Sequence, residues 1–201
     1  MGSSPIFSTA YFGEIPYFQS LLKYDEVLID SKERYKKQSW RNRTCILSSN
    51  GPLLLSVPVI KPNGSLSIVE EISISYDTNW QKDHWKAIES AYTHAPYFFY
   101  YGEMIKDIIY AGHDNLLDYN IFILKKILNW LSIEIEVDFS SEYFPPKDKT
   151  DYRVLLGEKK FNIKQESYIQ VFSDKLDFYP NLSILDLLMN QGPMARKYLG
   201  D

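Results

Sequence analysis

The sequence predicts a mixed α/β fold: a Rossmann-like strand–helix–strand start, then a hairpin, then a helical middle packed on the sheet. Three observations predict it. Apolar runs at residues 5–11 and 26–30 flank an amphipathic segment at 14–24, an Asn-Gly pair separates two later apolar runs, and three stretches with helical periodicity follow. A chain of 201 residues is long enough to bury one substantial core, so we expect a single domain over residues 1–201.

The start of the chain predicts a parallel pair of strands. Pro5–Tyr11 indicates a short buried strand, Glu14–Tyr24 a helix with one apolar face, and Glu26–Asp30 a second strand. Short joints between such elements favour a parallel pair, and ligands of parallel sheets bind beyond the carboxyl ends of the strands. Those ends lie at Tyr11–Gly13 and Asp30–Tyr35, and the second of them opens a basic stretch.

The next segment predicts a hairpin and a further strand. Arg43–Ser48 and Pro52–Val59 are strand-like runs on either side of Ser49–Gly51. The Asn-Gly pair in that turn favours a primed hairpin turn, in which both central residues take positive φ. Leu66–Tyr76 then alternates apolar and polar residues and predicts another strand.

The middle of the chain predicts three helices and a returning strand. Periodicity and capping residues place the helices from Thr78 or Asn79 to Ala95, from Pro96 to Gly112 and from Asn115 to Leu131. Ile133–Phe139 then alternates and predicts a strand, and Ser140–Asp151 is typical of a polar loop.

The last quarter is less regular. Tyr152–Leu156 and Tyr168–Phe172 indicate short strands. Ser183 begins a final helix, in which Asp186 is predicted to complete a capping box and Gly192 to give the stop.

Composition excludes several classes of protein. A net charge of −4 and a pI near 5.5 argue against general binding to nucleic acid or anionic membranes. The single cysteine, Cys45, precludes an internal disulfide and indicates a reducing compartment. No apolar run approaches the roughly 20 residues of a spanning helix, and the first residues lack a signal-peptide pattern, so we expect a cytoplasmic protein. The three His residues lack zinc-site spacing, and we expect neither metal nor cofactor.

The basic stretch Ser31–Arg43 predicts a local anion site. It carries six Lys or Arg and one Glu, a net +5 within a chain of net charge −4. Arg41 and Arg43 offer planar guanidinium groups that fit phosphate or carboxylate, and Trp40 offers an aromatic face. The lysines of the stretch are typical of a solvated loop, although Lys36 is also a candidate ligand contact.

Four further side chains are candidates for a site. His84 lies on the apolar face of its predicted helix, where it is either a general base or a core histidine with one hydrogen bond. Asn120 also lies on an apolar helix face, so its amide either bonds neighbouring backbone or faces a pocket. Asp30 ends the second strand and either pairs with a nearby arginine or contacts a sugar hydroxyl. Tyr11 is either part of a sugar-binding face or aromatic core packing.

A series of motifs extends along nearly the whole chain. They are TAYFGEIPYFQSLLKYDEVLID (Thr9–Asp30), YKKQSWRNRTCI (Tyr35–Ile46), NGPLLLSVPV (Asn50–Val59), WQKDHW (Trp80–Trp85), YTHAPYFFYY (Tyr92–Tyr101), LLDYNIFIL (Leu116–Leu124) and NLSILDLLMNQGP (Asn181–Pro193). Their order and combination resemble those of a bacterial family, the WbqC-like proteins. That family usually opens with a Gln-Pro pair before its Tyr-Phe motif, whereas Thr9 and Ala10 stand there in this chain. If that Gln contacts substrate, this chain differs from the family in ligand or in activity.

The resemblance implies a role in surface polysaccharide biosynthesis. Members of the family are often encoded with genes for O-antigen or other surface polysaccharide, and some are labelled as glycine or acyl transferases on amino sugars. By this resemblance we expect an acyl- or aminoacyl-type transferase acting on an amino-sugar nucleotide. The alternative is a non-catalytic module that binds an anion or a protein partner, which the replaced Gln-Pro pair and the lack of an obvious nucleophile favour.

In the transferase interpretation five of the candidate residues have a role. Arg41 and Arg43 hold the phosphates of the ligand. Trp40 and Tyr11 hold the sugar ring, and His84 accepts a proton from the attacking amine. The expected partner is therefore an anionic small molecule such as a nucleotide sugar, and no nucleic acid.

Overall fold

The computed structural model describes residues 4–145, 151–153 and 165–200, and it confirms a mixed α/β fold. Its parallel sheet has the strand order β1–β2–β7, formed by Ile6–Phe7, Glu26–Ile29 and Glu136–Phe139. The antiparallel pairs of the described residues are β3–β4, formed by Arg43–Ser48 and Gly51–Ser56, and β5–β6, formed by Val59–Ile60 and Ser73–Ile74. The α-helices are α1 (Ile15–Leu21), α2 (Trp80–Tyr92), α3 (Phe98–Ile109), α4 (Leu116–Trp130), α5 (Ile184–Gln191) and α6 (Ala195–Leu199), and the 3₁₀ helices are η1 (Gly64–Leu66), η2 (Val69–Glu71) and η3 (Gly192–Met194).

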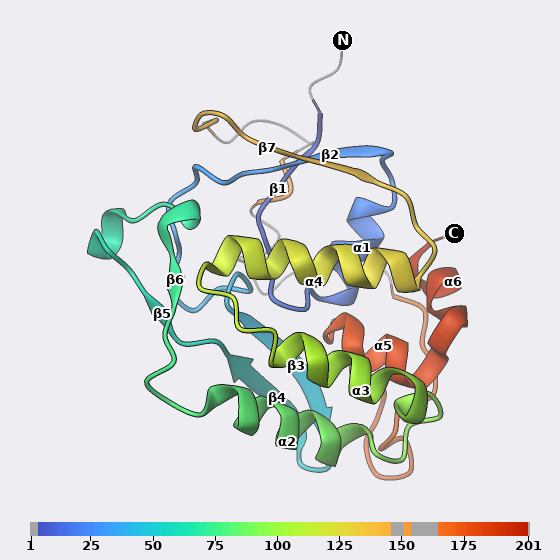
Figure 1. Ribbon diagram of the computed structural model, residues 1–201. Coiled ribbons are helices and arrows are strands. Elements are labelled where there is room, and N and C mark those ends of the chain that lie inside the picture. The colour runs from blue at the N-terminus through green and yellow to red at the C-terminus, as the bar shows by residue number, and fades with distance from the viewer. Residues whose placement is uncertain (1–3, 146–150, 154–164, 201) are drawn as a thin grey trace.

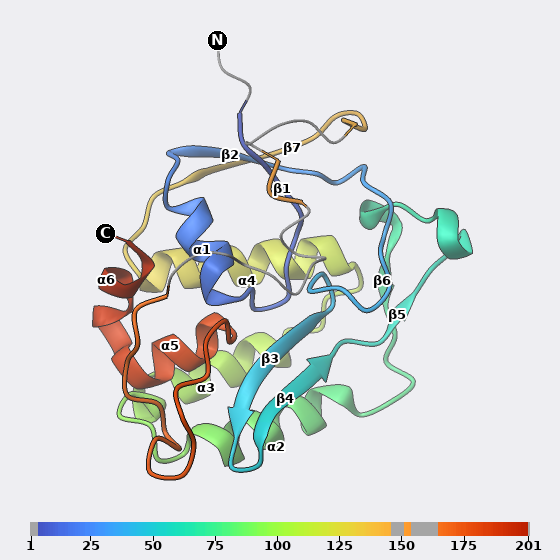
Figure 2. The same ribbon diagram turned by 180° about the vertical axis from the view of Figure 1, so that it is seen from behind.

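The helices lie on one side of the parallel sheet. Figure 1 shows α4 directly beneath the sheet, with α3 and then α2 further from it. Figure 2 shows the β3–β4 hairpin on the other side of the molecule, in front of α2. Buried apolar side chains from the sheet, the hairpin and all six α-helices form one continuous cluster, which is the core. Among the described residues, no helix is both long enough and apolar enough to cross a bilayer.

Helices α4 and α5 begin where local capping signals place them. The Asn115 side chain accepts hydrogen bonds from the backbone N–H groups of Leu117 and Asp118, at 2.8 and 3.1 Å. The Ser183 hydroxyl accepts a hydrogen bond from the N–H of Leu185 at 3.3 Å. Each cap satisfies amide groups that a helix start leaves without partners. The start at Ser183 was predicted from its capping residues, whereas α4 was predicted from its apolar periodicity.

The predicted parallel strand pair is confirmed, but the first strand is shorter than expected. Phe7 pairs with Ile29, and the ladder ends there. Beyond it the Ser8 carbonyl accepts a hydrogen bond from the Tyr17 hydroxyl at 3.1 Å, so a side chain replaces a neighbouring strand.

The predicted hairpin is confirmed, although its predicted turn type is wrong. Ser48 pairs with Gly51, which leaves Ser49 and Asn50 as the loop. Neither loop residue has positive φ, whereas Gly51 has a φ of 103°. Gly51 is therefore the first residue of β4, where its positive φ is adopted, and it is not a central residue of a primed turn.

The strand predicted over Leu66–Tyr76 is largely wrong. The N–H groups of Val69 and Glu70 donate to the backbone carbonyls of Glu33 and Ser31, at 3.0 and 3.1 Å. These contacts fold the segment into η1 and η2, and leave a strand of two residues, β6. The apolar residues of this segment, Val69, Ile72 and Ile74, are buried in the core, while its backbone bonds the basic stretch instead of forming a sheet ladder.

The capping box predicted at Ser183 is also wrong. The Asp186 carboxylate accepts hydrogen bonds from Tyr92, Tyr168 and Gln170, at 2.9, 2.6 and 3.0 Å. It is fully buried, and burial raises the pKa of Asp186. The carboxylate thus joins α5 to α2 and to the segment before α5, instead of capping its own helix.

The last two predicted strands have different outcomes. No strand forms at Tyr168–Phe172, where the Gln170 side chain bonds both the N–H and the carbonyl of Tyr179 at 2.9 Å. Hydrogen bonds from the Gln170 side chain therefore hold this segment in place, instead of the strand pairing that was predicted. Of Tyr152–Leu156, the described residues are 152 and 153, and they form no strand; the rest of that prediction lies outside the described residues.

Glu14 is a buried acid at the start of α1. Its residue exposure is 4%, and its backbone forms an isolated bridge with that of Ser183, at the start of α5. Burial raises the pKa of Glu14 to about 8. The carboxyl group is therefore largely protonated in the folded protein at neutral pH.

We expect Glu14→Gln to flatten the pH dependence of stability. Between the ordinary pKa of a glutamate and about 8, the folded state holds this proton and the unfolded state has lost it. The free energy of unfolding therefore falls as pH rises through that window, by up to about 1.4 kcal/mol per pH unit. Urea unfolding from pH 5 to pH 8 measures the slope. Glu89→Gln, an exposed acid on α2, is the control, and equal slopes in both variants contradict the prediction.

Two glycines with positive φ provide a matched test of packing. A Cβ on Gly192, which has a φ of 54°, would lie 2.3 Å from the ring of Tyr97. A Cβ on Gly112, which has a φ of 72°, would meet nothing closer than 4.0 Å. We expect Gly112→Ala to cost about 1 kcal/mol through backbone strain alone. Gly192→Ala should cost about 1–3 kcal/mol more, because Tyr97 must move and because a φ of 54° with a ψ of −129° lies outside the left-handed region. Chemical denaturation measures both costs, and equal costs would contradict the prediction.

Candidate functional site

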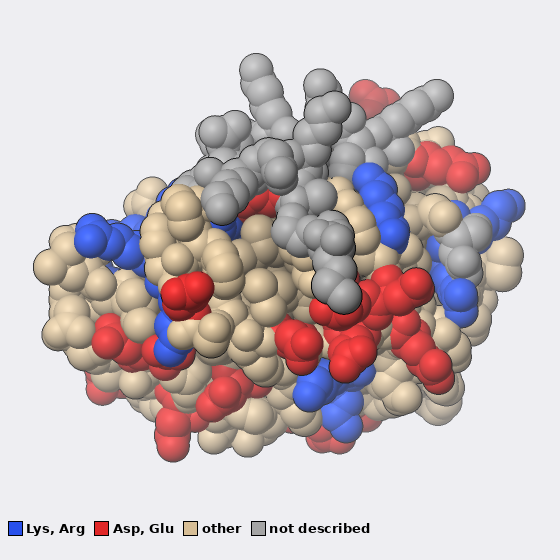
Figure 3. Space-filling view, turned by 90° about the horizontal axis from the view of Figure 1, so that it is seen from above, with Lys and Arg blue, Asp and Glu red and all other residues tan. Residues whose placement is uncertain are grey.

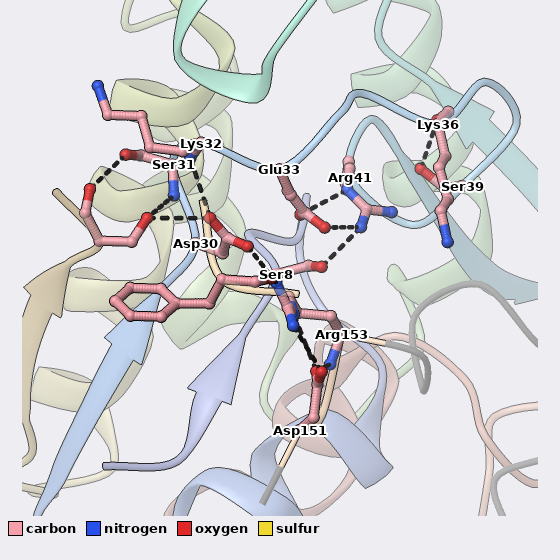
Figure 4. Close-up of polar contacts among 12 residues, drawn as sticks. Ser8, Asp30, Ser31, Lys32, Glu33, Lys36, Ser39, Arg41, Asp151 and Arg153 are labelled. Atoms are coloured by element: carbon pink, nitrogen blue, oxygen red, sulfur yellow. Dashed lines mark hydrogen bonds and ion pairs between the residues drawn. The ribbon is translucent and has the colours of Figure 1, made fainter. Parts of the chain in front are cut away.

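The carboxyl ends of β1 and β2 lie side by side, and two buried ion pairs follow them. Asp30 comes directly after β2 and pairs with Arg153. Glu33 pairs with Arg41, whose guanidinium also bonds Ser8, directly after β1. Figure 4 shows both pairs at this edge of the sheet. The predicted edge therefore carries charged groups.

Asp30 connects three distant parts of the chain. Its Oδ1 accepts hydrogen bonds from the N–H of Lys32 and the hydroxyl of Ser140, at 3.0 and 2.9 Å. Its Oδ2 accepts from Nη1 of Arg153 at 2.5 Å. The side chain has no solvent exposure, so its charge is balanced by these donors and not by water.

Arg153 is held by a second carboxylate as well. Its Nε and Nη2 donate to the two oxygens of Asp151 at 2.9 and 2.6 Å, a bidentate geometry. Its Nη1 also donates to the carbonyl of Phe144 at 2.7 Å. Hydrogen bonds to Asp151 and Asp30 raise the pKa of Arg153, so the guanidinium remains charged.

Arg41 has most of its donors engaged inside the protein. Its Nε and Nη2 donate to the Glu33 carboxylate at 2.8 and 2.5 Å, and Nη2 also donates to the Ser8 hydroxyl at 2.6 Å. The residue is fully buried, and its Nη1 has no hydrogen-bond partner among the described residues. The structure thus places Arg41 below the surface, with its charge already paired.

A cavity of about 690 Å³ opens above these pairs. Its lining combines the basic stretch with side chains from later loops: Lys32, Glu33, Arg34, Lys36, Ile68, Tyr143, Asp151 and Arg153. Arg34 and Lys36 are exposed, and neither forms an ion pair with a described residue. Four cations against two carboxylates give the lining a net positive charge, with the unpaired charges at its rim.

Of the residues predicted for the site, Lys36 lines the cavity, and Asp30 lies behind its wall through Arg153. Trp40 packs half-buried against the core, and Arg43 is half-buried at the start of β3. Arg41 is not among the lining residues either.

Three predicted residues lie together inside the core. The hydroxyl of Tyr11 and Nδ1 of His84 are 2.9 Å apart, and both residues are buried. Burial lowers the pKa of His84 to about 4, so the imidazole is neutral at physiological pH. The Asn120 amide donates to the backbone carbonyl of Arg41 at 2.7 Å, as its core interpretation requires. None of the three residues lines the cavity.

The sequence did not indicate Arg34, Asp151 or Arg153 as site residues. Arg34 stands in the basic stretch, but it lacks the neighbouring Trp that drew attention to Arg41. Asp151 and Arg153 lie two residues apart in a polar loop, where a charged pair is typical of a solvated surface. Arg153 and Asp30 are 123 residues apart in sequence, and no local signal joins them.

Comparison with known proteins identifies the relatives of this chain. It is 29% identical over 212 aligned positions to "Uncharacterized protein Rv1507c" of Mycobacterium tuberculosis (strain ATCC 25618 / H37Rv), an alignment that covers 91% of each chain. No solved structure matches it. The model of the WbqC-like protein family matches residues 9–165, which include the basic stretch and all but the last of the motifs listed above. The chain belongs to the WbqC-like protein family.

Proposed function

We propose that this chain binds an anionic small molecule, a nucleotide sugar or a similar phosphorylated sugar, in the cavity above the two ion pairs. One observation carries the proposal: Arg34 and Lys36 face the cavity with no carboxylate of a described residue paired to them. An anion that enters the cavity supplies the missing negative charge. Arg153 is fixed in the same lining by two carboxylates. Its position is therefore set before a ligand binds, which lowers the entropy cost of binding.

The distribution of charge favours a small anion over nucleic acid. On the face seen in Figure 3, Lys and Arg are scattered among Asp and Glu and form no continuous basic surface. The whole chain has a net charge of −4. A nucleic-acid surface needs a broad basic stripe, whereas a phosphate group needs a few converging donors.

Acyl or aminoacyl transfer to an amino-sugar nucleotide, in surface polysaccharide assembly, is the second candidate function. Its support is the family resemblance. The imidazole of His84 is neutral, as a general base must be, but its pKa of about 4 makes it a weak base at neutral pH. His84 is buried and bonded to Tyr11, so substrate must reach it by a change in the surrounding side chains. Ligand binding without turnover requires no such change, and the geometry supports it better.

We expect Arg34→Ala with Lys36→Ala to weaken anion binding by at least tenfold, because each removes a charged donor from the cavity. Calorimetric titration with UDP-N-acetylglucosamine and with inorganic pyrophosphate measures the dissociation constants. Thermal unfolding of the unliganded double variant should be unchanged, since both side chains are exposed.

The matched control for that experiment replaces Lys23 and Lys37, two exposed lysines outside the cavity lining, by Ala. It removes the same net charge from the chain. Equal weakening in both double variants would indicate general electrostatic attraction, and it would count against the cavity as the site.

The transferase candidate makes a separate prediction. With acetyl-CoA as donor and a UDP-linked amino sugar as acceptor, the amine displaces the thiol and free CoA is released. We expect His84→Gln to lower kcat at least a hundredfold with little change in KM, because a general base acts mainly in the transition state. His94→Gln, an exposed histidine after α2, should retain full activity. Small and equal effects of the two substitutions would remove His84 from the mechanism.

A further inference from the structure

A second cavity, of about 400 Å³, adjoins the first. Its lining includes carboxylates, hydroxyls and one aromatic ring: Ser31, Glu70, Asp118, Phe139, Ser140 and Ser141. Lys32 lines this cavity and also the cationic one. Lys32 is therefore the lining residue that the two cavities share.

The shared residue, Lys32, forms a partly exposed ion pair with Glu70. Nζ of Lys32 lies 2.5 and 2.6 Å from the two carboxylate oxygens of Glu70. The two side chains are 30% and 35% exposed, so solvent screens their attraction, and such pairs contribute little to stability. In Figure 4 the Lys32 side chain lies on one side of Asp30, and Arg153 lies on the other. Lys32 is also a lining residue of the cationic cavity, together with Arg34, Lys36 and Arg153.

The two cavities have opposite chemistry. The first contains Arg34, Lys36 and Arg153 in addition to Lys32, and it carries a net positive charge. The second contains two carboxylates, Glu70 and Asp118, and one cation, Lys32, so it carries a net negative charge. Carboxylates accept hydrogen bonds from hydroxyl groups, and cationic side chains donate to phosphate.

An exposed ring lies in the second cavity. Phe139, the last residue of β7, is 48% exposed, although it is a large apolar side chain. Beside it the Ser141 hydroxyl has no partner among the described residues, and the Asp118 carboxylate is exposed at the start of α4. An apolar ring face beside hydroxyl and carboxylate groups matches a pyranose, which presents C–H groups on its faces and hydroxyls around its edge.

We propose that the two cavities form one bipartite site for a sugar phosphate. The phosphate lies among Arg34, Lys36 and Arg153, and the hydroxyl-rich ring lies against Phe139 with its hydroxyls toward Asp118. Lys32 leaves Glu70 for the phosphate when ligand binds, and the freed Glu70 carboxylate accepts a sugar hydroxyl. This inference rests on the proposed function for its first half, and it adds the place and the chemistry of the second half.

The test compares two probes that share one phosphate group, inorganic phosphate and glucose 1-phosphate, by calorimetric titration. We expect glucose 1-phosphate to bind at least tenfold more tightly than phosphate. Phe139→Ala and Asp118→Asn should each remove most of that advantage and leave the affinity for inorganic phosphate unchanged or slightly higher. We do not expect an equal loss of affinity for both probes, because neither residue lines the cationic cavity.

Matched controls separate this effect from general damage. Tyr110→Ala removes a ring that is 47% exposed at the end of α3, and Asp114→Asn removes an exposed carboxylate just before α4; neither residue lines the second cavity. Both control variants should bind glucose 1-phosphate as the unmodified chain does. Thermal unfolding of all four variants identifies any that fail to fold.

The outcomes distinguish this inference from the proposed function. If inorganic phosphate binds and glucose 1-phosphate gains nothing, the bipartite site is wrong and the anion site stands. The bipartite site is also wrong, and the anion site stands, if the Phe139 and Asp118 variants lose affinity for both probes equally. If neither probe binds, and the Arg34 and Lys36 variants change nothing with nucleotide sugars, the proposed function fails together with the inference.

Discussion

The buried carboxylate of Asp30 is the interaction on which the edge of the sheet depends. It joins the end of β2, the residue after β7 and the loop that contains Arg153, through three hydrogen bonds whose donors come from three separate segments. A carboxylate without solvent contact is tolerated only when its lone pairs are used, and here they are used by backbone, hydroxyl and guanidinium donors. Three parts of the chain that are remote in sequence therefore share one anchoring point.

The second pair, Arg41 with Glu33, supports the same edge from the other strand. It fixes the turn of the basic stretch beneath the cavity, because Glu33 is both a partner of Arg41 and a lining residue. Buried pairs contribute little net stability compared with apolar packing, but the loss of one partner leaves an uncompensated charge and costs about 3–5 kcal/mol. The pairs are thus better understood as fixing one arrangement of the loops than as adding to the core.

Local patterns predicted most of the elements, and their failures have a common cause. The hairpin follows from the turn residues around Asn50, although its turn type differs from the predicted one. Helix α4 follows from its apolar periodicity, α5 from its capping serine, and the parallel strand pair from short joints. The strand predicted at 66–76 failed because its amides find partners in the basic stretch. The capping box failed because Asp186 serves Tyr92 and Tyr168, which no local pattern connects to it.

The sequence predicted the position of the candidate site more closely than its individual residues. A surplus of cations follows the second strand, and the structure has a cation-lined cavity at that edge, where Lys36 is a lining residue and Asp30 bonds the lining residue Arg153. The arginine beside Trp40 was predicted to contact the ligand, but Arg41 is buried under Glu33 and Ser8. The exposed cations of the lining are Arg34 and Lys36. Sequence spacing reveals which charges are near one another, whereas their depth depends on partners such as Arg153, which lies far away in the chain.

The depth of these charges has a further consequence, for the response of the protein to salt. The side chains of Arg41 and Glu33 are 0% and 7% exposed, so dissolved ions have little access to their pair. Arg34 and Lys36 lie in solvent, where the Debye length at physiological ionic strength is about 8 Å and attraction over longer distances is largely screened. Rising ionic strength therefore weakens the electrostatic potential that Arg34 and Lys36 produce in the cavity, and leaves the buried pair below it intact. The buried charges maintain the shape of the pocket, and the exposed charges make its electrostatic potential depend on the surrounding medium.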